Sequence, residues 1–192
     1  MNISILLPFK ENYSKEMAGA VSLFVKDTSN ISAFKKTIKI FGSTNSNKIL
    51  SKNYINLKSR KNFLKSANKE YVKSFLIHPG LKETDILEIH NRPSYIKQIR
   101  QSYNQKIFLY FHNDPLSMNG SRTETERDYL IRNVDKIIFN SKWSRNRFFL
   151  NSKFKEHMIN KSDICYQSTS KVSFDFNKKK KNYHFYWKVK LC

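Results

Sequence analysis

The chain has 192 residues, enough for one domain of ordinary size or for one domain and a short extension. Because 39% of its residues are hydrophobic and 14% aromatic, it can bury a core, which excludes a largely disordered chain. The net charge of +21 suggests a nucleic-acid partner, but only 8 of the 36 basic residues are Arg, the residue that a dedicated reader of phosphates and guanine edges favours.

Apolar runs alternate with helical patterns along the chain. Residues 3–7, for example, form a short apolar run that ends at Pro8, as does a strand buried on both faces of a parallel sheet. The elements expected in chain order are strand 3–7, helix 17–28, strand 37–41, a weak strand 54–57, helix 63–76, strand 85–89, helix 94–101, strand 106–111, helix 123–133, strand 136–139, helix 143–150 and a weak strand 163–167.

This alternation predicts an α/β fold, a Rossmann-like parallel sheet with helices on both faces. In open sheets of this kind, ligands bind beyond the carboxyl ends of the strands. Polar and helix-breaking residues follow those ends here, so the sequence places its candidate site there.

Two of the expected strands end in the same pattern, H-N-x-P. His90 and Asn91 lead to Pro93 after one strand, and His112 and Asn113 lead to Pro115 after the next. We expect both histidines to point into the crevice, with Asn113 and Asp114 supplying acceptors and donors for sugar hydroxyls. The alternative is that the histidines are structural.

Two loops carry weaker signals. Gly19 precedes a helix, where a substrate can approach the backbone and free N–H groups favour anions, although such a glycine is often only a turn. Residues 116–121 are polar and contain Gly120, as a substrate-gating loop does. The alternative is a plain connection into a helix that Thr123 caps with Glu126.

The sequence resembles the family 4 glycosyltransferases. The resemblance covers residues 1–177, is most specific at 85–150, and is carried by A-G-A-V-S-L-F-V at 18–25, K-I-F-L-Y-F-H-N-D-P at 106–115, E-T-E-R-D-Y-L at 124–130 and V-D-K-I-I-F-N-S-K-W-S-R-N-R-F at 134–148. In those enzymes a strand ends in an acceptor-side His, and a later strand resembling D-x-I-I-x-x-S ends in a Ser that starts a helix. The family's usual pair of glycines is reduced to Gly19 here.

The resemblance implies a retaining transferase of the GT-B type that makes cell-surface polysaccharide or lipopolysaccharide. It implies a hexosyl-type transfer from a nucleotide sugar to a glycan or lipid-linked acceptor, with no metal or other cofactor. His112 would be the catalytic residue at the reaction centre, and Ser141 would cap a helix. The acceptor would be bound by Gly19, His90, Asn91, Arg92, Asn113 and Asp114.

The resemblance also implies that the donor-binding half is missing. We expect a Rossmann-like glycosyltransferase domain at 1–177 and a basic tail at 178–192 that is out of frame. Removing one A from plausible codons of the lysine tract makes the message from Asn182 read I-I-T-F-I-G-K-L-N, which resembles the opening strand of a second domain. The alternative is a genuine basic tail.

The remaining features concern location and partners. Cys165 and Cys192 have no C-x-x-C spacing, which fits a reducing cytoplasm, and neither a signal peptide nor a membrane span is expected. The chain would be cytoplasmic, with peripheral contact to the inner face of the membrane. A strongly A/T-biased genome would explain the excess of Lys, whose codons are A/T-rich. The alternative is a functional basic face, which would make the chain a stand-alone binding module for anionic lipid or nucleic acid. A decaying gene product with no stable role is a third possibility.

Overall fold

Seven parallel strands form the centre of the molecule. The computed structural model describes residues 1–58, 66–154 and 156–167. In this part of the chain the strands pair in the order β3-β2-β1-β4-β5-β6-β7. Their bounds are β1 Ile3–Leu6, β2 Ile38–Gly42, β3 Tyr54–Asn56, β4 Ile86–His90, β5 Lys106–Phe111, β6 Lys136–Phe139 and β7 Ser162–Ile164.

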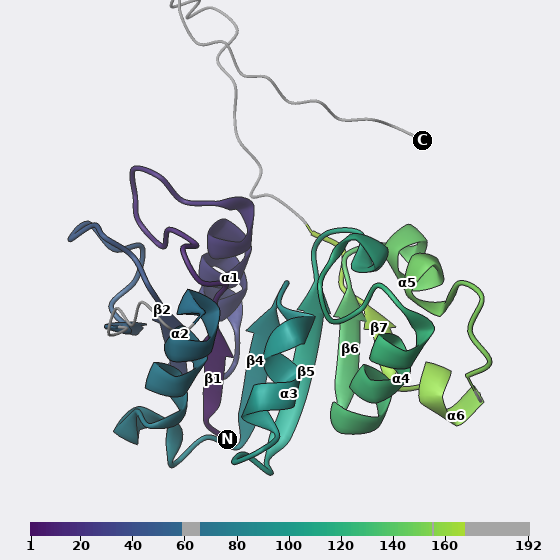
Figure 1. The fold of residues 1–192 in the computed structure, drawn as a ribbon. Coiled ribbons are helices and arrows are strands. Elements are labelled where there is room, and N and C mark those ends of the chain that lie inside the picture. The colour runs from purple at the N-terminus through teal and green to yellow at the C-terminus, as the bar shows by residue number, and fades with distance from the viewer. Residues whose placement is uncertain (59–65, 155, 168–192) are drawn as a thin grey trace, which may run out of the picture.

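Helices cover both faces of this sheet. In Figure 1, α2, α3 and α4 lie in front of the strands, and α1 lies behind them. The helices are α1 Ala20–Ile31, α2 Ala67–Leu76, α3 Ile96–Ile99, α4 Glu124–Asn133, α5 Lys142–Phe149 and α6 Glu156–Ile159, with 3-10 turns η1 Pro79–Leu81, η2 Pro93–Tyr95 and η3 Pro115–Ser117. The chain has the predicted Rossmann-like α/β fold.

The core is divided by the sheet into two clusters, because successive side chains of a strand point to opposite faces. Ile3 and Ile5 of β1 pack with Val21 and Val25 of α1 in the smaller cluster. Leu6 belongs to the larger cluster, which α2, α3, α4 and α5 complete on the other face. Short apolar runs without alternation therefore predicted the doubly covered strands correctly.

The strand order creates the crevice that the site uses. From β1 the chain moves outward to β2 and β3, and then returns through α2 to β4 on the other side of β1. In open α/β sheets the connections on the two sides of a switch point diverge, and the crevice in which ligands bind is the space beyond the carboxyl ends of the strands there. The segments that follow β1, β4 and β5 meet there.

Most expected elements lie within three residues of their observed bounds. The helix expected at 94–101 is instead the 3-10 turn η2 followed by one turn of α3, because Pro93 starts a tight turn. The helix α6 was not expected. Residues 63–65 of one expected helix and the whole 178–192 tail lie outside the described residues. Across the described part of the chain, none of the helices combines the length and apolarity needed to cross a bilayer.

Candidate functional site

Two histidines from neighbouring strands meet at the carboxyl edge of the sheet. His90 is the last residue of β4 and lies opposite Tyr110 of β5, whereas His112 follows the end of β5. The two rings stack at 18° with 5.2 Å between their centroids. His90 Nδ1 and His112 Nε2 are 2.9 Å apart and share one hydrogen bond.

The backbone around His112 is fixed by two asparagine side chains. Asn91 adopts a left-handed conformation with φ of 52°, which Asn tolerates better than most residues. Its Oδ1 accepts a 2.8 Å hydrogen bond from the His112 N–H. Asn140, which follows β6, donates from Nδ2 to the His112 carbonyl at 2.8 Å. Both peptide groups of His112 are therefore satisfied by side chains, and this orients the imidazole.

Aromatic side chains surround the histidine pair. Tyr110 stacks on His90 at 4.5 Å between ring centroids, and the edge of Phe24 from α1 meets His112 at 4.9 Å. The pKa of both histidines is lowered to about 3, in His90 by burial and in His112 by burial and then by the nearby His90. Both imidazoles are therefore neutral near pH 7, so each ring has one N–H and one accepting nitrogen.

Gln167 occupies the crevice side of His112. Its Nε2 lies 2.6 Å from His112 Nδ1, and its side chain is exposed. An amide nitrogen only donates, so His112 Nδ1 is the acceptor. A ligand hydroxyl that replaced Gln167 would find the same acceptor. Nothing in the sequence pattern singled out this residue, because it reaches His112 only through the pairing of β7 beside β6.

The expectation that His90 points into the crevice was wrong. Its side chain is only 1% exposed and lies behind His112. Its Nε2 has no hydrogen-bond partner, and the nearest charged group is the Glu88 carboxylate at 3.6 Å. The β4 strand is buried on both faces here, because α1 covers the side that His90 occupies. His90 therefore has no direct contact with the crevice.

The other residues of the H-N-x-P segments differ in their exposure to a ligand. Asn91 is also buried and holds the backbone, as described above, so its side chain does not face a ligand. Arg92 is half-buried and donates from Nη1 to the Asn91 carbonyl at 2.8 Å. Asn113 is exposed beside His112 and remains available to a ligand.

The carboxylate of Asp114 is hydrogen-bonded to other groups of the chain. Its carboxylate receives hydrogen bonds from Arg147 of α5, at 3.0 Å from Nη2, and from the Leu116 N–H at 3.0 Å. Burial alone would raise the pKa of Asp114, but these hydrogen bonds and the charge of Arg147 lower it. The pair fastens the η3 turn to α5, so the carboxylate supports the loop instead of presenting free acceptors.

The carboxylate of Glu11 occupies the place that Gly19 was expected to offer to an anion. Gly19 is the N-cap of α1 and provides no side-chain cap. Glu11 Oε1 accepts from the Ser22 N–H at 3.2 Å, and a Cβ on Gly19 would overlap its carboxyl group. The glycine is therefore needed for the close approach of Glu11, which satisfies the positive end of the helix.

The loop at 116–121 has the geometry of a fixed connection. Ser121 is buried and donates from Oγ to the Pro115 carbonyl. Gly120 has φ of 93°, and a Cβ there would meet the backbone of Ser94 at 2.7 Å. The predicted capping box is present, with Thr123 Oγ1 accepting from the Glu126 N–H. These contacts favour the connection over a gate.

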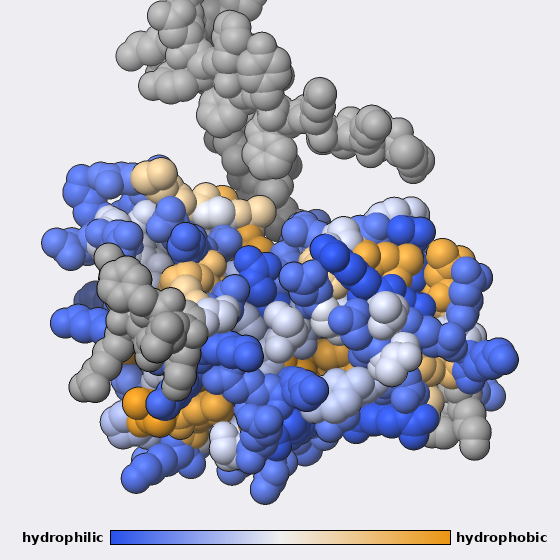
Figure 2. Space-filling model, in the orientation of Figure 1, coloured by the Kyte–Doolittle hydropathy of each residue, from blue (hydrophilic) through white to orange (hydrophobic). Residues whose placement is uncertain are grey.

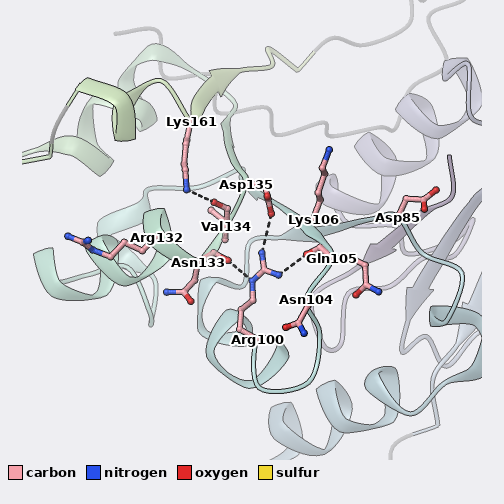
Figure 3. Close-up of a pocket in the computed structure, with 10 residues that line it drawn as sticks. All are labelled: Asp85, Arg100, Asn104, Gln105, Lys106, Arg132, Asn133, Val134, Asp135 and Lys161. Carbon is pink, nitrogen blue, oxygen red and sulfur yellow. Dashed lines mark hydrogen bonds and ion pairs between the residues drawn. The ribbon is translucent and has the colours of Figure 1, made fainter.

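A second cavity lies at the opposite edge of the sheet (Figure 3). Arg100 donates there to the carbonyls of Asn133 and Gln105 and to Asp135 at 2.6, 2.7 and 3.1 Å. Lys161 donates to the Val134 carbonyl. The two cations satisfy the carboxyl end of α4 and the residues that follow it, which is a structural use of their charge. Among the described residues, no group of three or more His, Cys, Asp and Glu side chains is arranged to hold a metal ion.

Neither a family model nor a curated protein matches the sequence. Solved structures do match. Sucrose-phosphate synthase from Thermosynechococcus elongatus matches with a TM-score of 0.57 and 14% identity over 88% of this chain and 49% of that one. Anabaena HepE in complex with UDP and glucose matches with a TM-score of 0.58 and 11% identity over 86% of this chain and 44% of that one.

A second structure of the Thermosynechococcus synthase has a TM-score of 0.56 and 10% identity, and the match covers 88% of this chain and 90% of that one. The chain spans about half the length of the first two proteins. At these identities the likeness concerns the fold. This chain therefore has the Rossmann-like fold of the N-terminal half of GT-B glycosyltransferases.

Proposed function

We propose that this chain is the acceptor-binding half of a nucleotide-sugar-dependent glycosyltransferase, with His112 at the reaction centre. The observation that carries the proposal is the place of His112. It lies at the switch-point crevice of a sheet that has the fold of solved glycosyltransferases, with one ring nitrogen turned toward the crevice. The geometry suits a polar ligand, since Gln167 already hydrogen-bonds there.

The acceptor would be bound by the exposed parts of the crevice. Asn113 beside His112 and the half-buried Arg92 are the candidates that the fold leaves accessible. His90, Asn91, Asp114 and Gly19 would act through the groups that they hold in place. HepE was solved with UDP and glucose, which supports a nucleotide sugar as the co-substrate here.

The finer assignments come from the sequence resemblance. We propose a retaining, hexosyl-type transfer in the assembly of surface polysaccharide or lipopolysaccharide, without a metal ion. The acceptor would be a glycan or lipid-linked sugar, met in the cytoplasm or at the inner face of the membrane. The donor nucleotide would be held by a second domain, so this chain would be inactive by itself.

The proposal is tested in a protein whose reading frame is restored after residue 181. That protein should release nucleoside diphosphate from at least one of a panel of nucleotide sugars in the presence of lipid-linked glycans. His112→Ala should lower turnover by about 10²-fold or more, the scale typical of a positioned catalytic group. His90→Gln should lower kcat more than it raises KM, because His90 does not reach the acceptor. Absence of release from every sugar nucleotide would reject the function.

A further inference from the structure

The half-buried carboxyl of Glu88 continues the line of polar groups that begins at the crevice. Glu88 and His90 lie two residues apart on β4, so their side chains are on the same face of the sheet. Glu88 Oε2 is 3.6 Å from His90 Nε2, the buried nitrogen without a hydrogen-bond partner. His90 Nδ1 in turn is 2.9 Å from His112 Nε2. Glu88 belongs to no motif of the sequence, and the proposed chemistry at His112 does not explain why an acid lies there.

The hydrogen-bond donors along this line follow from one contact. Gln167 donates to His112 Nδ1, so the proton of the neutral His112 ring is on Nε2. This Nε2–H then donates to His90 Nδ1, which leaves the His90 proton on Nε2. The His90 Nε2–H lies 3.6 Å from Glu88 Oε2, beyond hydrogen-bond distance, so a proton transfer between them requires these two atoms to approach each other. Every group therefore points its proton away from the crevice and toward Glu88.

We propose that Glu88, His90 and His112 form a proton relay, in which a proton accepted by His112 at the crevice is stored on the Glu88 carboxyl. The transfer balances in three steps. His112 Nδ1 gains a proton from the crevice, His112 Nε2 passes its proton to His90 Nδ1, and His90 Nε2 passes its proton to Glu88. Afterwards both rings are again neutral, each with its proton on Nδ1, Glu88 is a carboxylic acid, and the Gln167 amide has turned so that Oε1 accepts from His112 Nδ1–H.

The electrostatics of the site fit this arrangement. Burial raises the pKa of Glu88 to about 7, although a hydrogen bond with Tyr110 works in the opposite direction. Burial lowers the pKa of both histidines to about 3. An isolated His112 would therefore be a poor base at neutral pH, whereas the relay has the proton affinity of Glu88. The Glu88 side chain is 18% exposed, so it can return the proton to solvent away from the crevice.

Among the described residues, the side chains that face Glu88 come from β5, β1 and α1. From β5 the neighbour is Tyr110, whose pKa is raised by burial and then by the charges of Glu88 and Cys165. From β1 the paired residue is Ile5, and α1 contributes the uncharged ring of Phe24 beside His90. Cys165 is therefore a further titratable group whose charge acts on Tyr110 beside the relay.

In glycosyl transfer the relay would take the proton of the acceptor hydroxyl. The O–H bond breaks as the oxygen bonds to the anomeric carbon on the face from which the phosphate departs, which retains the anomeric configuration, and the bond to the nucleotide phosphate breaks with its electron pair on the phosphate. This use rests on the proposed function, whereas the relay itself is a property of the chain. His112 would be the catalytic residue, and Glu88 and His90 would be positioning residues that act through it.

Nitrogen-15 NMR of histidine-labelled protein tests the relay in the full 192-residue chain without any sugar. Between pH 5.5 and 8.5, His90 and His112 should change tautomer together, from Nδ1–H at low pH to Nε2–H at high pH, with a midpoint near 7 and no imidazolium signal. Glu88→Gln should abolish the step. In His90→Gln, which interrupts the chain, His112 should no longer switch.

Two further variants make the test specific. Tyr110→Phe removes the hydroxyl that lowers the pKa of Glu88, so the midpoint of the tautomer step should move to higher pH. This variant provides a test of the relay if the other variants fold poorly. Glu83→Gln is the matched control, since Glu83 is exposed and lies before the opposite end of β4, and it should leave the step unchanged.

The relay is overturned if either ring keeps one tautomer throughout, if the step forms imidazolium, or if it persists in Glu88→Gln. These results do not depend on glycosyl transfer. If this chain shows the tautomer step but the frame-restored protein releases no nucleoside diphosphate, the relay is upheld and the proposed function is rejected. If the frame-restored protein transfers sugar but this chain shows no tautomer step, the proposed function is upheld and the relay is rejected.

Discussion

The three titratable groups around His112 should give the stability of this protein a maximum near pH 6.5. The pKa values of His90 and His112 fall to about 3 on folding, so below pH 6.5 the unfolded chain binds protons that the folded protein does not. Stability is therefore lost as the pH falls. Glu88, with its pKa raised to about 7, has the opposite sign, and its contribution falls as the pH rises from about 4.5 to 7.

Between pH 4.5 and 6.5 the unfolded chain binds two protons on the histidines, whereas the folded protein binds one on Glu88. Unfolding therefore takes up one net proton. The free energy of unfolding should therefore change by about 1.4 kcal/mol per pH unit from these groups. Urea unfolding at pH 5.0 and 6.5 measures this difference. In the variant that combines His90→Gln and His112→Gln the difference should reverse, because only Glu88 remains. Equal stability of the original protein at both values would contradict the burial of two neutral histidines.

At the scale of single elements, the start of α4 is the clearest case of sequence chemistry. Thr123 accepts from the Glu126 N–H at 3.2 Å, and Glu126 accepts from the Thr123 N–H at 3.0 Å. Thr123→Ala removes one half of this exchange and should lower the free energy of unfolding by about 1 kcal/mol. Thr123→Ser keeps the hydroxyl and should cost much less. Denaturant titration compares them, and equal losses would mean that the cap does not stabilise the helix.

The N-terminus of α1 also needs a hydrogen-bond acceptor for its free N–H groups, and a residue outside the helix supplies it. Its N-cap, Gly19, has no side chain, and the carboxylate comes from Glu11, eight residues earlier. Helix N-termini attract negative charge, so an internal carboxylate and an external anion compete for this position. The N-terminus of α1 is thereby occupied by an acid of the loop after β1.

At the scale of the whole molecule, the 192-residue chain should not transfer sugar by itself. It spans about half the length of the sucrose-phosphate synthase and HepE chains that it matches. Catalysis by positioning and charge stabilisation needs groups on both sides of the transferred sugar, and the proposed function gives this chain the acceptor side only. Incubation with nucleotide sugars should give nucleoside diphosphate at the buffer rate only. Turnover above that rate would show that one domain suffices.

The charge of +21 should produce weak binding to polyanions that depends strongly on salt. Figure 2 shows hydrophilic residues spread over the face that α2, α3 and α4 cover, with small hydrophobic patches between them. Spread surface charge is screened within about 8 Å at physiological salt, so affinity should fall steeply between low and physiological salt. Vesicle and DNA binding assays measure this. Tight, sequence-selective DNA binding at physiological salt would favour the binding-module hypothesis instead.

Local chemistry decided much of what the sequence could predict. Apolar runs bounded by Pro, Gly and Asn determined the strands, since a doubly covered strand buries apolar side chains on both faces, with few polar exceptions such as Ser4 and His90. The capping residues Ser141 and Thr123 were identified because a cap is formed within three residues of the chain. The parallel sheet followed from the alternation of elements, and the crevice followed from the sheet.

The tertiary structure decided which polar side chains the crevice receives. His90 and His112 occupy equivalent places in the sequence pattern, yet α1 buries the first and leaves the second half-exposed. Gln167 and Arg147 reach His112 and Asp114 from elements 55 and 33 residues away. No local pattern encodes such contacts, because they depend on the order in which distant strands pair. The sequence by itself determined the fold and the edge of the site, and the packing of α1, α5 and β7 determined its chemistry.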